Sequence, residues 1–392
     1  MLHQHAKLFT DPLIQYPIDN FNLPFANYIE KNKKIIANTR EDISQYKADI
    51  IEANAPFELR PVEKPTAGVL LIHGLLDSPF IMQDIGRTLV QHGCLVRSVL
   101  LPGHGTVPGA LLNTNYAEWI QTVRYGIATL KSEVEKIFLI GHSTGALLSL
   151  YHAAEDSSIN GVAAIAPAIK INSAFDFVAN WHHILSWAWE RAKWFYIAEE
   201  SDYTKYISIP YNAIYQVYHL AKIIKKIPEE KFANCPIFMV STYEDRIVCS
   251  KASMAYFKKN KNPANHLLLY AGKKLREKDP RITVRSSFYP ELGIKNFSHV
   301  SLPIAPTNPH YGEQGDYALA SHINKNKFIY GAQNKIETWI YDFLYHSKLI
   351  KFQHHRLTFN PDFNHLMDEI ETFRNLCNDR QRNKSKPTAT YL

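Results

Sequence analysis

Residues 137–154 read IFLIGHSTGALLSLYHAA, and this stretch decides the fold. Its first four residues form a short apolar run, typical of a strand buried on both faces of a parallel sheet. The residues after Gly145 favour a helix, so GHSTG lies at a tight strand-to-helix turn. Gly141 and Gly145 lack Cβ atoms and let the backbone close around Ser143. A GxSxG pattern in this setting predicts an exposed, nucleophilic serine at the carboxyl end of the sheet.

The same alternation of strands and helices extends outward in both directions. The expected strands are 68–73 (GVLLIH), 94–101 (CLVRSVLL), 161–166 (GVAAIA), 236–240 (PIFMV) and 266–271 (HLLLYA), and the expected helices are 81–92, 116–131, 145–154 and 250–259. Strands that alternate with helices form βαβ units. The sequence therefore predicts an α/β fold with a doubly wound, mostly parallel sheet.

The alternation pauses in the middle of the chain, which predicts an insertion. We expect a polar N-terminal extension at 1–60, a core at 61–167 and 235–345, an aromatic-rich helical lid at 168–234, and a C-terminal helical extension with a frayed tail at 346–392. The lid range is unusually aromatic. Thirteen aromatic residues fall between Phe175 and Tyr218, and they are Phe175, Phe177, Trp181, Trp187, Trp189, Trp194, Phe195, Tyr196, Tyr203, Tyr206, Tyr211, Tyr215 and Tyr218.

Composition limits the class of protein. The chain has 392 residues, 46% apolar and 21% charged, as in ordinary globular proteins. No apolar stretch approaches the roughly 20 residues of a membrane helix. The N-terminus has no Sec-type signal peptide pattern, and four cysteines without CxxC spacing suit a reducing compartment. We expect a cytoplasmic protein, with peripheral membrane contact as an option.

The net charge of +7 comes from 44 basic and 37 acidic side chains. This excess is too diffuse to indicate a nucleic-acid partner, although it is compatible with an anionic membrane surface. HExxH, P-loop and EF-hand patterns are absent from the sequence, so no metal or cofactor is expected.

Three motifs together resemble the α/β-hydrolase superfamily, most closely its bacterial carboxylesterases, monoacylglycerol lipases and lysophospholipases. They are VLLIHGLLDSP at 69–79, LPGHGT at 101–106, and GHSTG. The resemblance implies ester hydrolysis through an acyl-enzyme on Ser143, with the backbone N–H groups of Leu75 and Thr144 as oxyanion hole. An acyltransferase with the same triad, or a non-catalytic lipid- or partner-binding member of the fold, is the alternative.

The acid and the histidine follow the serine in this fold. Asp245 comes just after strand 236–240 and before an apolar pair, as in the family pattern, and Glu244 is the alternative acid. The first histidine after strand 266–271 is His299, beyond a charged inserted segment at 272–296, and His310 is its rival. The predicted triad is therefore Ser143, Asp245 and His299.

The aromatic lid suggests the substrate. Trp181, Trp187 and Trp194 are predicted to line an apolar acyl-chain site, because pockets for apolar ligands are built from such side chains. The alternative is that the aromatic stripe only packs the lid on the core. The expected substrate is a lipid-like ester, such as a monoacylglycerol or a lysophospholipid.

Overall fold

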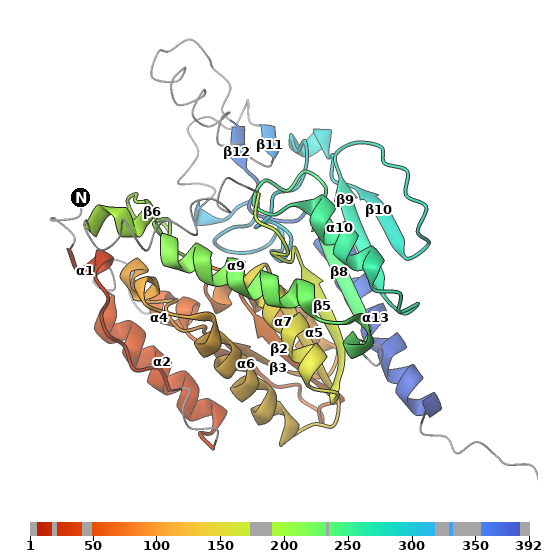
Figure 1. Ribbon diagram of the computed structural model, residues 1–392, viewed down its shortest axis with the longest axis horizontal. Coiled ribbons are helices and arrows are strands. Elements are labelled where there is room, and N and C mark those ends of the chain that lie inside the picture. The colour runs from red at the N-terminus through yellow and green to blue at the C-terminus, as the bar shows by residue number, and fades with distance from the viewer. Residues whose placement is uncertain are drawn as a thin grey trace, which may run out of the picture.

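A computed structural model describes residues 6–17, 22–40, 49–172, 190–232, 235–317, 329–331 and 354–384. Its centre is an eight-stranded sheet in the order β1-β3-β2-β4-β5-β8-β9-β10 (Figure 1). The strands are β1 (Phe57–Leu59), β2 (Ala67–Ile72), β3 (Cys94–Val99), β4 (Ile137–His142), β5 (Ile159–Ile165), β8 (Ile237–Thr242), β9 (His266–Ala271) and β10 (Ile282–Ser286). Among the strands of this eight-stranded sheet, only β1 pairs antiparallel. The predicted doubly wound, mostly parallel α/β fold is confirmed.

Helices cover both faces of the sheet. One face carries α6 (Tyr116–Lys131), α7 (Thr144–Glu155) and α9 (Tyr211–Lys226), and the other carries α5 (Gln83–Gln91) and α13 (Phe363–Lys384) (Figure 1). Other short elements include α10 (Ser250–Lys259), η1 (Pro79–Met82), η2 (Pro108–Leu112), η5 (Pro290–Leu292), β11 (Ile329–Gly331) and β12 (His354–Arg356).

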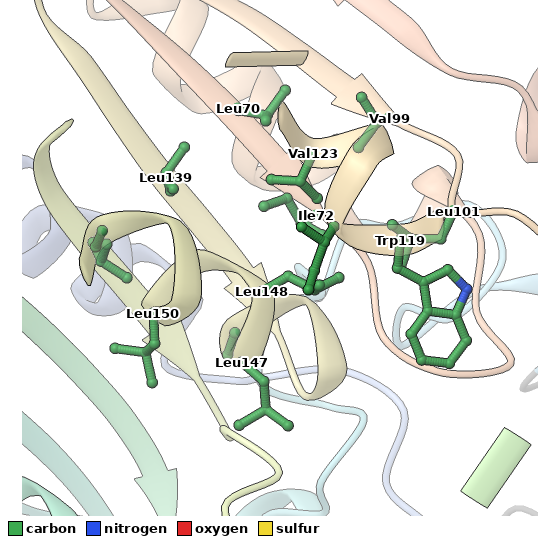
Figure 2. Packing of buried hydrophobic residues seen from close by; sticks show 14 of the residues in the cluster. Leu70, Ile72, Val99, Leu101, Trp119, Val123, Leu139, Leu147, Leu148 and Leu150 are labelled. Carbon is green, nitrogen blue, oxygen red and sulfur yellow. The ribbon is translucent and has the colours of Figure 1, made fainter. Parts of the chain in front are cut away.

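The strands supply the core on both sides, because alternate residues of a strand face opposite ways. On β2, Leu70 and Ile72 join the cluster under α6 and α7, whereas Val69 and Leu71 join the cluster under α5 and α13. Figure 2 shows the first cluster, where Val123 of α6 and Leu148 of α7 meet the strand residues. Burial on both faces explains why the strands read as continuous apolar runs.

The order of the strands also locates the site. The chain passes from β2 to β3 on one side and then returns to β4 on the other side of β2. Open α/β sheets bind ligands outside the carboxyl ends of the strands at such a reversal. Ser143 follows β4 directly, so it lies at this place.

The N-terminal region packs on the core and contributes a strand to the sheet, unlike the polar extension that was expected. Its elements are α1 (Ala6–Phe9), α2 (Phe25–Thr39) and α4 (Asp49–Asn54). Tyr28 and Ile36 are buried, and the Tyr28 hydroxyl donates to the Leu100 carbonyl at 3.0 Å. The sheet itself begins within the predicted extension, because β1 pairs with β3. Charged residues lie between the apolar residues of α2, so its packing face is hard to recognise in the sequence.

The described part of the insertion is partly helical. It contains η3 (Glu190–Lys193), β6 (Trp194–Tyr196), β7 (Ile209–Pro210), α9 and η4 (Glu229–Phe232). Helix α9 buries an aliphatic stripe, Ala213, Val217, Leu220 and Ile224, rather than its tyrosines. Tyr211, Tyr215 and Tyr218 are only half-buried. Helix α9 therefore packs on the core through small and branched side chains. Trp181, Trp187 and Trp189 lie outside the described residues.

Candidate active site

The turn at Ser143 has the geometry of a strained elbow. Ser143 has φ 54° and ψ −110°, a positive φ that non-glycine residues rarely adopt. Its N–H donates to the Ile165 carbonyl at 2.8 Å, which ties the turn to the end of β5. A Cβ at Gly141 would lie 2.2 Å from the Gly145 carbonyl carbon, and one at Gly145 would lie 2.1 Å from the Ile72 oxygen. Both flanking glycines are therefore required by close backbone contact.

Asp245 and His299 form a buried pair. The Asp245 Oδ1 atom accepts from the backbone N–H groups of Ile247 at 2.8 Å and Val248 at 2.9 Å. Its Oδ2 atom lies 2.7 Å from His299 Nδ1. Backbone donors thus hold one carboxylate oxygen, and the other holds the imidazole. When Nδ1–H donates to this carboxylate, Nε2 of the neutral ring is left as the proton acceptor.

The loop that carries His299 is anchored beside the elbow. His142 directly precedes Ser143, and its Nε2 atom lies 3.1 Å from the His299 carbonyl oxygen. The two imidazole centroids are 5.0 Å apart. In the described part of the chain no hydrogen bond joins Ser143 Oγ to His299, so the approach of serine and imidazole belongs to the proposal below.

The two alternative residues are engaged elsewhere. Glu244 accepts from the Gly272 N–H at 3.1 Å and faces the start of the inserted segment. His310 belongs to a different polar cluster. The geometry therefore brings together Asp245 and His299, and neither Glu244 nor His310 joins that pair.

The loop after β2 runs beside the serine. A Cβ at Gly74 would lie 3.2 Å from Ser143 Cβ, so a larger residue here would crowd the serine, and Leu75 follows it. His73 supports the loop, because its Nδ1 contacts the Gly74 oxygen at 2.8 Å and its Nε2 accepts from Leu101 N–H at 3.1 Å. Burial lowers the pKa of His73 to about 3, so this imidazole is neutral and structural. The N–H of Thr144 begins α7 on the other side of Ser143.

A buried carboxylate lies behind this loop, and sequence analysis did not single it out. Asp77 Oδ2 is 3.7 Å from His142 Nδ1, too far for a hydrogen bond but close enough for strong electrostatic coupling. Burial alone would raise the pKa of Asp77, but His142 and the charge of Lys205 outweigh it and lower the pKa. The sequence could have pointed to Asp77, because it is an acidic residue inside the otherwise apolar GLLDSP turn.

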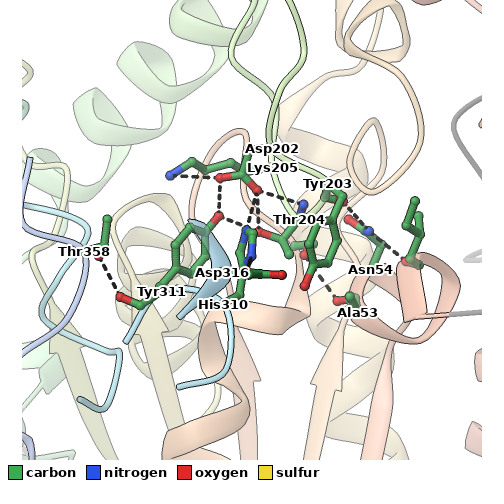
Figure 3. A network of polar contacts seen from close by, with 12 residues as sticks. Ala53, Asn54, Asp202, Tyr203, Thr204, Lys205, His310, Tyr311, Asp316 and Thr358 are labelled. Carbon is green, nitrogen blue, oxygen red and sulfur yellow. Dashed lines mark hydrogen bonds and ion pairs between the residues drawn. The ribbon is translucent and has the colours of Figure 1, made fainter. Parts of the chain in front are cut away.

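His310 lies in the polar cluster drawn in Figure 3. Its Nε2 is 3.2 Å from Asp202 Oδ1, and its Nδ1 contacts Asp316. Tyr311 donates to Asp202 Oδ2 at 2.6 Å, and the Thr204 hydroxyl donates to Oδ1 at 3.0 Å. These contacts join the insertion, which carries Asp202, to the loop after His299.

The charge of this cluster is balanced internally. Burial opposes ionisation of Asp202, but the nearby Lys205 and His310 outweigh burial and hold its pKa well below the ordinary value. Lys205 Nζ lies 3.6 Å from Asp202 Oδ2 and 4.8 Å from the Tyr311 ring centre. The cluster therefore binds the insertion to the core through a buried ionic contact.

Tyr206 joins the insertion to the loops that follow β2 and β3. Its backbone N–H donates to the Leu76 oxygen at 2.8 Å, and its hydroxyl accepts from the Thr106 N–H at 2.7 Å. Trp194, by contrast, is buried edge-on against Phe9 of α1, with ring centres 5.3 Å apart. The role predicted for Trp181, Trp187 and Trp194 in substrate binding stays a prediction.

The described residues hold neither a cluster of metal ligands nor a helix that could cross a membrane. Within these ranges, no group of three or more His, Cys, Asp or Glu side chains is placed to hold a metal ion. Nor does any described helix combine the length and the apolar character that crossing a bilayer requires.

The family model described as "Serine aminopeptidase, S33" matches residues 63–274, just over half of the chain. Over 109 residues the chain is 33% identical to a thermostable monoacylglycerol lipase of Bacillus sp. (strain H-257), covering 28% of this chain and 44% of that protein. Over 96 residues it is 33% identical to a carboxylesterase of Bacillus subtilis (strain 168), covering 24% and 38%. The chain thus spans less than half the length of these curated relatives.

Among solved structures, a monoacylglycerol lipase of Paleococcus ferrophilus is similar with a TM-score of 0.45 and 21% identity. That match covers 55% of this chain and 88% of the other.

Proposed function

The chain belongs to the α/β-hydrolase family described as serine aminopeptidase, S33, and from this premise we propose that it hydrolyses carboxylic esters through Ser143. The observation that carries the proposal is the buried Asp245–His299 pair, held beside the strained turn that presents Ser143. The similar Bacillus proteins, a monoacylglycerol lipase and a carboxylesterase, support a carboxylic ester as the substrate.

In the proposed reaction, Ser143 Oγ attacks the ester carbonyl while His299 Nε2 takes its proton. The carbonyl oxygen becomes an oxyanion, which the N–H groups of Leu75 and Thr144 stabilise. Collapse of this intermediate breaks the ester bond, and His299 returns the proton to the departing alcohol. Water then attacks the acyl-enzyme by the same route and releases the acid. Asp245 holds the imidazole in the required tautomer and stabilises its charged form.

A lipid-like ester is the proposed substrate class. The monoacylglycerol lipase similarity supports it, as does the aromatic content of the insertion. Tyr206 joins this insertion to the Leu76 and Thr106 loops, which supports a lid near the Ser143 elbow. Monoacylglycerol or lysophospholipid fits this reading, with the enzyme meeting the lipid at a membrane or micelle surface.

The first test addresses the nucleophile. Ser143→Ala should lower kcat about a thousandfold or more, because the acyl-enzyme cannot form. A fluorophosphonate probe should label the unmodified enzyme and fail to label this variant. Ser132→Ala, which alters an exposed serine outside the site, is the control and should label normally. Full labelling of Ser143→Ala would refute the assignment.

The second test addresses the acyl chain. Each methylene buried in an apolar site contributes about 0.8 kcal/mol, so kcat/KM for p-nitrophenyl esters should climb from acetyl toward medium-length acyl groups. Truncation of a lid tryptophan that faces the pocket should flatten the climb and leave acetyl ester turnover nearly intact. A flat or falling profile in the unmodified enzyme would replace the lipid-ester proposal with a small-ester hydrolase.

The family description also favours a second candidate, an aminopeptidase. The same triad can cleave an amide, so an amino-acid p-nitroanilide should be assayed beside the esters. The ester proposal expects turnover of the anilide to be negligible in comparison. Added alcohol in the ester assay would reveal acyl transfer as an ester product.

A further inference from the structure

Exposed apolar side chains gather at one edge of the molecule. Among the described residues only seven large hydrophobic side chains are exposed, and three of them follow β8 or β10, the parallel strands on either side of β9. These are Ile247, Phe288 and Leu292, with exposed fractions of 44%, 51% and 38%. Isolated exposed apolar residues are ordinary, but a group of them beside a site marks an interaction surface.

Basic side chains lie in the same loops as these three residues or in neighbouring loops. We call the whole group the basic rim, and it consists of the apolar Ile247, Phe288 and Leu292 with the exposed cations Lys170, Arg246, Lys273, Lys274 and Lys295. Nearby acidic residues include Glu244, which accepts from the Gly272 N–H, the exposed Glu291, and Asp362, which pairs with Arg285. The rim therefore carries a local excess of positive charge.

Backbone contacts gather these segments at the carboxyl ends of β8 and β9. A Cβ at Gly272 would lie 2.6 Å from the Lys295 oxygen, so the lysines after β9 lie beside Lys295. The Ser287 N–H donates to the Ala271 oxygen at 3.0 Å, which brings the start of the Phe288 loop to the same edge. The Cys249 N–H donates to the Lys170 oxygen at 2.7 Å, beside Ile247.

The loop that carries Phe288 and Leu292 is rigidly attached to the site. Tyr289 and Ile294 exchange two backbone hydrogen bonds of 2.9 Å each, which closes a short turn around Gly293. The Tyr289 ring stacks on Phe297, which is fully buried two residues before His299. The apolar side chains of the rim are thus presented by a loop anchored to the histidine loop.

From this arrangement we propose that the basic rim docks the enzyme on an anionic lipid surface. Its apolar side chains would enter the interface, and its cations would pair with lipid phosphates, the combination that peripheral proteins use. Cations near such a surface strengthen binding about fivefold each. The purpose of the docking rests on the proposed function, since a lipid ester would then enter beside Asp245 and His299.

The test is co-sedimentation of the full chain with vesicles, of phosphatidylcholine alone or with about 30% phosphatidylglycerol. The unmodified protein should bind the anionic vesicles at least tenfold more strongly, and added salt should weaken that binding. The double variants Lys273→Glu/Lys274→Glu and Phe288→Ser/Leu292→Ser should each weaken it at least tenfold. Circular dichroism and thermal unfolding confirm that these variants are folded.

A matched control uses a second basic surface. Lys225 and Lys226 are exposed at the end of α9, where Lys225 lies beside Lys259 at the C-terminal end of α10. The double variant Lys225→Glu/Lys226→Glu should bind vesicles as the unmodified protein does. An equal loss in this variant, or failure of the unmodified protein to bind, would overturn the proposal.

The measurement separates docking from catalysis. Vesicle binding by Ser143→Ala should equal that of the unmodified protein, because binding requires no hydrolysis. An enzyme that binds vesicles but does not cleave esters would refute only the proposed function. An active esterase that ignores anionic vesicles would refute only the docking.

Discussion

Two buried histidine–aspartate pairs in this molecule share their residue types but differ in their surroundings. His299 Nδ1 lies 2.7 Å from Asp245, and within the described residues its other nitrogen has no hydrogen bond. His310 has a carboxylate at each nitrogen, Asp202 at 3.2 Å from Nε2 and Asp316 at Nδ1. An imidazole can accept a substrate proton only at a nitrogen that is not already occupied. An aspartate partner alone therefore does not mark a catalytic histidine. What distinguishes His299 from His310 is that its second ring nitrogen is available to accept a proton.

The largest expected effect tests this difference directly. His299→Ala should lower kcat on a soluble ester about a thousandfold or more, because the proton acceptor for Ser143 is removed. The free energy of unfolding should change far less than in a variant of the His310 cluster. Steady-state kinetics and urea unfolding of the same preparation measure both quantities.

His310→Ala is the comparison variant, and it should affect stability more than kcat. The folded fraction of this variant should keep kcat within about tenfold of the unmodified enzyme, well short of the loss expected from a triad member. A thousandfold loss of kcat in a folded His310→Ala protein, with an active His299→Ala enzyme, would reverse the two assignments.

The next effect concerns stability. Asp202→Ala removes the buried carboxylate that His310, Tyr311 and Thr204 share, and breaking such a buried pair costs about 3–5 kcal/mol of unfolding free energy. The Asp316 side chain, the other partner of His310, is 66% exposed. Asp316→Ala should therefore lower the free energy of unfolding by less than about 1 kcal/mol. Equal losses in chemical denaturation would contradict the idea that the insertion is held through Asp202.

The smallest effect involves buried histidines that have no carboxylate in hydrogen-bond contact. Burial lowers the pKa of His73 to about 3 and those of His104 and His152 to about 4, from an ordinary value of 6.5. Between about pH 6.5 and 4 the unfolded chain binds protons on these rings and the folded chain does not. The free energy of unfolding should therefore fall as the pH falls through this window.

His152→Gln isolates one of these rings at a distance from the site. His152 Nε2 contacts the Ile120 oxygen at 3.1 Å, and the amide of glutamine can donate in its place. The variant should lose less stability on acidification, by up to about 1.4 kcal/mol per pH unit. Urea unfolding between pH 7 and 5 measures this, and an unchanged slope would argue against a neutral buried His152.

Much of the fold could be predicted because its signals are local. The bounds predicted for α6, α10 and β9 agree with the structure, since each has its own periodicity or apolar run. The short β1 and the packing of α2 were missed, because their partners lie far away in sequence. The packing face of α9 could not be read from its tyrosines, because the aliphatic Val217 and Leu220 fill the core and are buried instead.

The sequence by itself determined the turn at Ser143, because two glycines, a strand and a helix within 18 residues leave the backbone few other conformations. It also predicted Asp245 as the acid and His299 as the base of the triad, with Glu244 and His310 as the alternatives. Only the tertiary structure decided which histidine meets Asp245, and it alone paired Asp77 with His142 and Asp202 with His310. The two residues of each pair are 54 to 108 positions apart in sequence and lie in different segments of the chain. The distance between them therefore depends on how the whole sheet and the insertion pack.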